Sequence, residues 1–334
     1  MAYRSLNNIA KQLLPSFLWG GLRSTKNSLR LRFRTVFENL GYTIALTDNY
    51  YSPLPSVSHL KSTFKRWNRP SELVAIEYNL QDMMADFANL LACYLDEFLQ
   101  IPPYTTLEKM GFGPGYAEID ALTLYMMIRH IKPRRYIEVG AGLSTYYCSL
   151  AAERNGKDGY PLQIICIEPH PFRKLNTIPG IDLIVKEVQT VERSFFQQLA
   201  ASDVLFIDSS HILRIDGDVP FLYLEVLPSL NPGVLIQIHD VPFPYNIPYP
   251  PDLWIFGQDW PMFWNEAMVL QAFLCFNKAF KIVVSTPLIR HFDETFLHER
   301  IPFYKSVDEN PNTFSSIWLR RIDPNILGAW DAHL

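Results

Sequence analysis

The twelve residues 134–145 constrain the fold of this chain more than any other stretch. They run Arg-Arg-Tyr-Ile-Glu-Val-Gly-Ala-Gly-Leu-Ser-Thr, so a short apolar run is followed by a glycine turn and then by helix-opening residues. Glycine tolerates positive φ and lets a ligand approach the backbone closely, while free N–H groups at a helix start face that ligand. Thr145 stands where a dinucleotide fingerprint has its third glycine. The stretch therefore predicts a site for a nucleoside with a short charged tail rather than for a pyrophosphate.

Short apolar runs of this kind recur along the chain, and helix-compatible segments separate most of them. This alternation predicts an α/β fold, a doubly wound Rossmann-like sheet that is mostly parallel and covered on both faces. Ligands of such sheets lie beyond the carboxyl ends of the strands, where four acids of this chain fall. The further strand candidates are 163–168, 181–186, 203–208, 234–240, 280–285 and 315–320, the helix candidates are 144–154, 192–201, 219–229 and 264–278, and the acids are Glu138, Glu168, Asp208 and Asp240.

The ordered motifs of residues 137–145, Cys-Ile-Glu-Pro, Ile-Asp-Ser-Ser-His (207–211) and Ile-His-Asp (238–240) resemble those of class I S-adenosylmethionine (SAM)-dependent methyltransferases. The resemblance is nearest to a bacterial group that also carries Tyr-Tyr-Ser-Pro and Phe-Trp-Asn-Glu stretches, found here at 50–53 and 263–266. It covers roughly residues 40–300. It implies a seven-stranded sheet whose last strand is antiparallel.

The same resemblance implies how the cofactor would be bound. Glu138 and Gly140 would face the methionine end of SAM, Glu168 would take the ribose, and Gln189 would meet the adenine where the family often has an acid. A carboxylate at the tip of the second strand suits the ribose, because it accepts both hydroxyl hydrogens. The full candidate set for SAM is Glu138, Gly140, Ala141, Gly142, Ser144, Thr145, Glu168, Pro169, Gln189 and Asp208.

A second group of candidate residues follows the fourth and fifth strand candidates. Asp208 and His211 end one, His239 and Asp240 end the next, and neighbouring strands would bring them to one rim. His211 could act as general base on a substrate hydroxyl, since an ordinary imidazole pKa near 6.5 suits proton abstraction. Asp208, Asp240 and His239 could instead hold a divalent cation that lowers the pKa of that hydroxyl. The simpler alternative is structural, with Asp208 accepting backbone N–H groups and His239 satisfied at a strand end.

The metal interpretation also has a family counterpart. The pattern Ile-Asp-x-x-His resembles magnesium-dependent sugar O-methyltransferases and cephalosporin hydroxylase-like proteins, which carry two acids where this chain has His239 and Asp240. Imidazole in place of a carboxylate weakens the case for Mg²⁺ and leaves Mn²⁺, Fe²⁺ or no metal. Catalysis is expected to depend on Asp208, His211 and Asp240.

Residues 241–266 form a long connection rich in proline and aromatic residues, directly after Asp240. Connections of this length are usually lids or binding loops, and aromatic faces stack on sugar or aromatic rings. A homodimer interface would use the same residue types. The expected activity is methylation of a hydroxyl on a small-molecule or glycan-like acceptor. The alternatives are a nicotinamide-dependent (NAD) oxidoreductase, which shares the strand, turn and helix, and a scaffold of the same fold without catalysis.

The organisation expected is an N-terminal basic segment and helical cap over 1–100, followed by the SAM-binding domain over 101–334. Residues 1–35 carry seven Lys or Arg and no acid. They could lie on an anionic membrane surface, or form a short helix that docks on this chain or a sister subunit. Residues 68–100 have helical spacing, in which Met83, Met84 and Phe87 either line a tunnel or, more commonly, pack in the core.

Composition excludes several other classes. The net charge of −4 gives no basic field for nucleic acid. Four cysteines without Cys-x-x-Cys spacing indicate free thiols in a reducing cytoplasm rather than a disulfide framework or a zinc site. No apolar run approaches the ~20 residues that a membrane-spanning helix needs.

Overall fold

A computed structural model describes residues 30–46, 49–112, 115–306, 309 and 314–323, and the chain divides into two compact units, 1–64 and 65–334. In the first unit, residues 30–39 form a helix and α3 spans Val57–Ser62. Most of the basic segment lies outside the described residues. Its last six residues belong to the helix 30–39, where Leu31 and Phe33 are exposed. Among the described helices, none combines the length and the apolar character of a membrane span.

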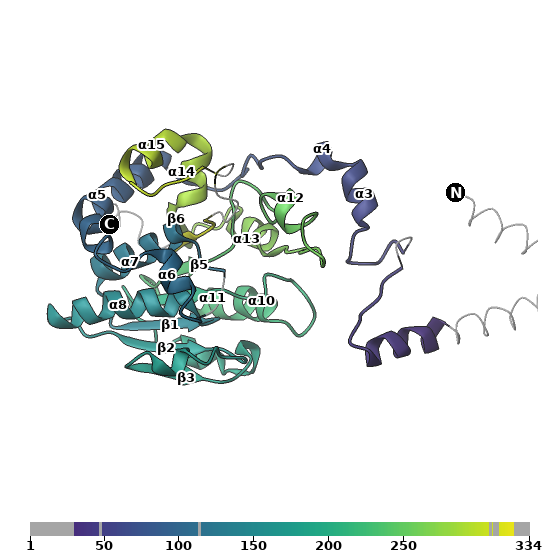
Figure 1. The fold of residues 1–334 in the computed structure, drawn as a ribbon, viewed down its shortest axis with the longest axis horizontal. Coiled ribbons are helices and arrows are strands. Elements are labelled where there is room, and N and C mark those ends of the chain that lie inside the picture. Colours follow the sequence, from purple (N-terminus) through teal and green to yellow (C-terminus); the bar gives the residue numbers. More distant parts are fainter. Residues whose placement is uncertain (1–29, 47–48, 113–114, 307–308, 310–313, 324–334) are drawn as a thin grey trace, which may run out of the picture. The chain divides into compact units, whose positions relative to one another are not determined.

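The second unit is built on a seven-stranded sheet (Figure 1). The strand order is β3-β2-β1-β4-β5-β7-β6, all parallel except β7, which is antiparallel to both of its neighbours. The expected fold class and the antiparallel last strand are thereby confirmed. The strands are β1 Arg135–Val139, β2 Gln163–Ile167, β3 Ile181–Ile184, β4 Val204–Ile207, β5 Leu235–Ile238, β6 Phe280–Ser285 and β7 Ile317–Arg321.

This topology gathers the candidate residues at one edge of the sheet. The central strands β4 and β5 are buried at every position, as expected for strands covered on both faces. The carboxyl ends of β1, β2, β4, β5 and β6 lie at the same edge, and β7, running the other way, begins there. Residues that follow β1, β2, β4, β5 and β6, or precede β7, can therefore meet.

Helices α5 (Leu80–Phe98), α7 (Glu118–Ile131) and α8 (Leu143–Lys157) pack against one another in that order, and α5 also contacts β6 and α14 (Thr286–Phe292). Helix α7 is buried on all sides, as its nearly continuous apolar sequence requires. The remaining helices are α4 Phe64–Trp67, α6 Tyr104–Glu108, α9 Arg193–Phe196, α10 Asp218–Phe221, α11 Leu227–Ser229, α12 Pro251–Trp254, α13 Glu266–Leu274 and α15 Glu294–Arg300, with a π-helical turn at Leu222–Val226.

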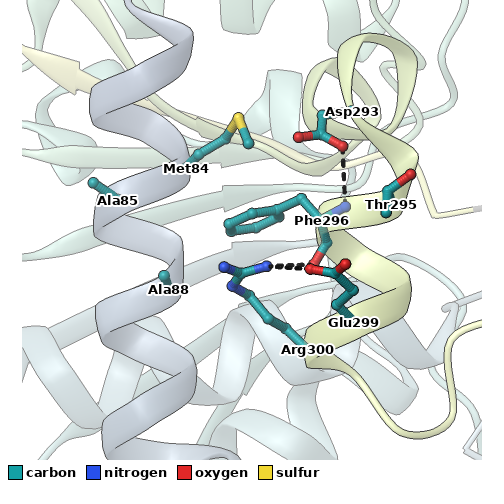
Figure 2. Close-up of a pocket in the computed structure, with 8 residues that line it drawn as sticks. All are labelled: Met84, Ala85, Ala88, Asp293, Thr295, Phe296, Glu299 and Arg300. Atoms are coloured by element: carbon teal, nitrogen blue, oxygen red, sulfur yellow. Dashed lines mark hydrogen bonds and ion pairs between the residues drawn. The ribbon is translucent and has the colours of Figure 1, made fainter.

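The methionine stripe of α5 divides between core and surface. Met83 and Phe87 are buried in the core, and Phe87 packs near Phe296 of α15. Met84 instead lines a surface groove between α5 and α15 (Figure 2). The other lining residues are Ala85, Ala88, Asp293, Thr295, Phe296, Glu299 and Arg300. The groove contains none of the residues at the strand ends.

Candidate active site

The turn after β1 is held against the end of β4. Gly140 has φ +81°, and its N–H donates to the carbonyl of Ile167 at 3.0 Å. A Cβ at this position would lie 2.1 Å from the carbonyl oxygen of Asp208. Only glycine fits, because the left-handed backbone and the close contact with Asp208 both exclude a side chain.

Glu138 lies beneath this turn rather than on its surface. It is fully buried, and its carboxylate accepts hydrogen bonds from the hydroxyls of Ser144 and Thr145, the latter at 2.6 Å. Thr145 Oγ1 in turn accepts the N–H of Gly142 at 3.1 Å. Burial raises the pKa of Glu138 to about 8, against the opposing effect of the two hydroxyls. Three of the predicted SAM residues therefore form an internal brace that shapes the start of α8.

Glu168 joins the turns after β1 and β2. Its Oε2 accepts the N–H of Ala141 at 3.3 Å, and its Oε1 accepts the N–H of His170 at 2.7 Å, across Pro169. The side chain is only partly buried, so it can reach a ligand above the turn. Gln189 lies further along the edge, where its Nε2 donates to Glu187 at 3.0 Å and to the carbonyl of Asp216 at 3.3 Å.

The second predicted group does assemble at the ends of β4 and β5. The Nε2 of His211 lies 3.3 Å from Asp208 Oδ1 and 3.2 Å from Asp240 Oδ2. One ligand atom from each of these three residues falls within 4.8 Å of the others. His211 is buried, whereas both carboxylates are partly exposed, so the cluster is accessible from one side.

The other ring nitrogen of His211 is fixed by a residue that the sequence analysis did not assign. Nδ1 lies 2.7 Å from Oε2 of Glu266, which is buried at the start of α13. Burial alone would lower the pKa of His211, but the bonds to Asp208 and Glu266 and the charge of Asp240 raise it to about 10. These contacts favour the protonated form of His211. The ring also faces Trp264, with centroids 4.7 Å apart.

His239 lies deeper than His211 and uses both nitrogens within the protein. Nδ1 is 3.2 Å from Asp208 Oδ1, and Nε2 is 3.3 Å from Oδ2 of Asp120, a fully buried acid in the first turn of α7. Burial disfavours charge on His239, but the acids around it raise its pKa well above the ordinary value. Both ring nitrogens of His239 therefore contact acids, while the three residues whose ligand atoms come together are Asp208, His211 and Asp240.

The central part of the chain, which includes β1, β2, β4 and β5, is similar to known proteins. Residues 137–241 match a family described as a methyltransferase domain. Residues 137–241 are thus similar to a methyltransferase domain. An uncharacterized protein of Archaeoglobus fulgidus is 26% identical over 190 residues, which cover 53% of this chain and 83% of that protein.

Solved structures of methyltransferases resemble this chain at low identity. The O-methyltransferase TomG of Streptomyces achromogenes, in complex with SAM, has a TM-score of 0.39 at 12% identity, over 75% of this chain and 92% of that one. An O-methyltransferase of Bacillus cereus in complex with SAH has a TM-score of 0.41 at 11% identity, over 73% and 100% of the two chains.

Three residues that complete this site lie outside the family match, residues 137–241. Glu266 fixes His211, and Asp120 fixes His239 while accepting the N–H groups of Ser315 and Ser316 at 3.0 and 3.1 Å. Ser315 donates its hydroxyl to Asp240 Oδ1 at 2.8 Å. The available sequence signal was the Phe-Trp-Asn-Glu stretch for Glu266 and, for Asp120, an acid among the apolar residues of the first turn of α7.

Proposed function

We propose that this protein is a SAM-dependent methyltransferase that methylates a hydroxyl of a small-molecule or glycan-like acceptor. The observation that carries the proposal is the double role of Asp208. Its carbonyl oxygen meets the backbone of Gly140, and its carboxylate meets His211. A cofactor held at the glycine turn and an acceptor held at the ionic cluster would therefore be neighbours, as methyl transfer requires.

The turn and the tip of β2 fit the cofactor. Glu168 would exchange its bonds to the N–H groups of Ala141 and His170 for the two ribose hydroxyls. Gln189 would lie at the adenine end, and the brace formed by Glu138, Ser144 and Thr145 would keep the turn in shape. SAM supplies an activated methyl group and its own leaving group. In the transfer, the acceptor oxygen would bond to the methyl carbon while the carbon–sulfur bond breaks and its electron pair stays on sulfur. The hydroxyl proton would pass to solvent on the side of the cluster where Asp208 and Asp240 are partly exposed.

The cluster at the strand ends fits a divalent cation held by Asp208, His211 and Asp240. Glu266 binds Nδ1 of His211 and leaves Nε2 pointing at both carboxylates, which is the usual way that a carboxylate orients a histidine ligand. Two carboxylates and one imidazole suit Mn²⁺ somewhat better than Mg²⁺. Such an ion would lower the pKa of the acceptor hydroxyl and orient its oxygen.

His211 as general base is the second candidate role, and its surroundings oppose it. A base must be neutral when it meets the hydroxyl, but hydrogen bonds to Asp208 and Glu266 keep the pKa of His211 near 10. Ligation to a metal would displace this proton. Calorimetry of Mn²⁺ binding at pH 7.5, in buffers of different ionisation enthalpy, should therefore show release of about one proton per ion. Binding without proton release would contradict the ligand assignment.

The aromatic connection after β5 suits a ring-shaped acceptor. The ring of Trp264 faces His211, and the ring centroids of Trp254 and Trp264 are 5.8 Å apart. Two indole rings therefore lie beside the cluster. Indole faces exclude water and stack on sugar rings. This arrangement supports a glycan-like acceptor. The alternative role of these aromatic residues is contact between two copies of the chain in a homodimer. Analytical ultracentrifugation would detect such a dimer.

The cofactor is tested by calorimetry with SAM, SAH and NAD. SAM and SAH should bind and NAD should not, and the reverse result would favour an oxidoreductase.

With candidate hydroxyl acceptors, formation of SAH should stop on treatment with EDTA and return with Mn²⁺. The variants Asp240→Asn and His211→Ala should bind SAM yet lose transfer. If both variants support normal function in cells, the protein acts as a scaffold.

We also propose that the protein works in the cytoplasm. Cys93, Cys148, Cys166 and Cys275 are all free thiols, which suits a reducing compartment. Contact of the basic segment with a membrane surface remains a separate proposal. Sedimentation of the full chain with vesicles containing anionic lipid, compared with neutral vesicles, would test it.

A further inference from the structure

Arg290 lies close to the candidate active site but has no part in the mechanism above. It belongs to α14, which begins where β6 ends, at the edge of the sheet that carries the ionic cluster. Its guanidinium carbon is 4.5 Å from the centre of the Phe314 ring. The next residue, Ser315, donates to Asp240 at 2.8 Å. Phe314, whose ring lies under the guanidinium, therefore directly precedes the residue that bonds to Asp240 of the cluster.

Arg290 forms no ion pair within the described part of the chain. Its guanidinium lies over the Phe314 ring, and its Nη1 is buried without a hydrogen-bond partner. The two acids whose charges act on it have other donors. Glu294 accepts the hydroxyl of Tyr304 at 2.8 Å, and Asp120 accepts the N–H groups of Ser315 and Ser316.

Arg290 is partly buried, and a partly desolvated cation that lacks an ion pair opposes folding, because the desolvation of its charge is only partly offset. Burial accordingly lowers the pKa of Arg290. Such a group is expected where a ligand provides the missing charge. Guanidinium offers a planar fork of N–H donors that matches the two oxygens of a carboxylate or phosphate.

We propose that Arg290 binds an anionic oxygen group, carboxylate or phosphate, on the methyl acceptor. This inference rests on the proposed function, because it places the anion beside the hydroxyl that is methylated. The aromatic connection, residues 241–266, also contacts α14. Tyr245 stacks on Tyr249 with centroids 3.9 Å apart and lies 6.2 Å from His291, the neighbour of Arg290. The acceptor would then present a ring to the aromatic connection and a negative charge to α14.

The proposal is tested with inorganic phosphate and acetate as probes, each added to the full chain at constant ionic strength. The variants are Arg290→Met, which keeps most of the side-chain volume, and Arg300→Met. Arg300 is the matched control because its guanidinium lies 4.2 Å from a phenylalanine ring, that of Phe296, but in the groove of α5 and α15 (Figure 2).

Phosphate or acetate should raise the melting temperature of the wild type and of Arg300→Met. Arg290→Met should need at least a tenfold higher concentration of the anion for the same rise. The probe with the higher affinity indicates whether the anion is a phosphate or a carboxylate. Equal effects on all three proteins, or no effect on the wild type, would overturn the proposal.

A second measurement separates binding from structure. Without ligand, Arg290→Met should melt at the same temperature as the wild type or higher, because it removes an unpaired buried charge. A clearly lower melting temperature would identify Arg290 as a structural residue and reject the inference. SAM binding, measured in parallel, tests the proposed function by itself. A protein that binds SAM but no anion retains the methyltransferase assignment and loses only the anion site.

Discussion

The Nδ1 atom of His211 and the Oε2 atom of Glu266 lie 2.7 Å apart inside the protein, although 55 positions separate the two residues in the sequence. The bond links the loop after β4 to the first turn of α13. The backbone repeats the link, since the N–H groups of Asn265 and Glu266 both donate to the carbonyl of His211. The imidazole is consequently fixed from one side, and its Nε2 faces Asp208 and Asp240.

The first prediction concerns this bond. Glu266→Gln should lower the affinity for Mn²⁺ about 10- to 100-fold, the usual effect of losing a carboxylate that orients a histidine ligand. Titration calorimetry measures it. Glu299→Gln, on the exposed surface of α15, is the control and should bind Mn²⁺ like the wild type. Unchanged affinity in Glu266→Gln would show that the cluster does not bind the ion through His211.

The second prediction concerns the glycine turn. Gly140→Ala should destabilise the protein by about 2–5 kcal/mol, because left-handed backbone strain adds to overpacking against Asp208. It should also abolish SAM binding. Gly180→Ala is the matched control, since Gly180 has φ +76° but open space where a Cβ would be. It should cost only about 1–2 kcal/mol and leave SAM affinity intact. Urea unfolding and calorimetry with SAM would check both, and equal destabilisation would contradict the close contact.

The third prediction concerns the tip of β2. Glu168→Ala should weaken SAM binding about 10- to 100-fold, because hydrogen bonds to a charged acceptor contribute about 1.5–3 kcal/mol. Glu153→Ala removes an exposed acid of α8 that pairs with Lys157 and serves as the control. Calorimetry with SAH gives the two affinities. If the Glu168→Ala variant binds SAH at wild-type strength, the ribose lies elsewhere.

The fourth prediction concerns pH. Burial raises the pKa of Glu138 from its ordinary 4.5 to about 8, so the folded state binds this proton more tightly than the unfolded state. The contribution to stability is full below about pH 4.5 and is lost as the pH rises toward 8. Glu138→Gln should remove this loss, which amounts to at most about 1.4 kcal/mol per pH unit.

Urea unfolding of both proteins between pH 5.5 and 8.5 provides the measurement. The advantage of Glu138→Gln over the wild type should grow up to about pH 8 and then level off. Dissociation of the His211 proton also lowers the free energy of unfolding as the pH rises. This contribution is the same in both proteins, so it cancels in the difference between them. Parallel curves would show that Glu138 is ionised throughout.

Much of the sheet could be predicted from the sequence, because buried parallel strands are short continuous apolar runs. The candidate 280–285 coincides with β6, and β5 lies inside the candidate 234–240. The helices were less predictable. The candidate 192–201 shortens to α9, since Ser202 takes a left-handed backbone and the side chain of Asp203 accepts the N–H of Ala200. These are local turn contacts that apolar periodicity does not encode.

The site was predictable only where it follows strand ends. Asp208, His211 and Asp240 meet because their strands are neighbours, which topology determines. The partners of the two histidines come from helices far away in the sequence. Asp120 reaches His239 from α7, and Glu266 reaches His211 from α13. The spacing of apolar residues in α7 does not indicate which loop the side chain of Asp120 will contact.

The position of β7 determines when this site can exist. It is the last strand along the chain but lies between β5 and β6, and the residues just before it supply two N–H groups to Asp120 and a hydroxyl to Asp240. A nascent chain still lacking these residues has both acids without those donors. Synthesis must therefore pass Ser316 before Asp120 and Asp240 can receive all of these hydrogen bonds.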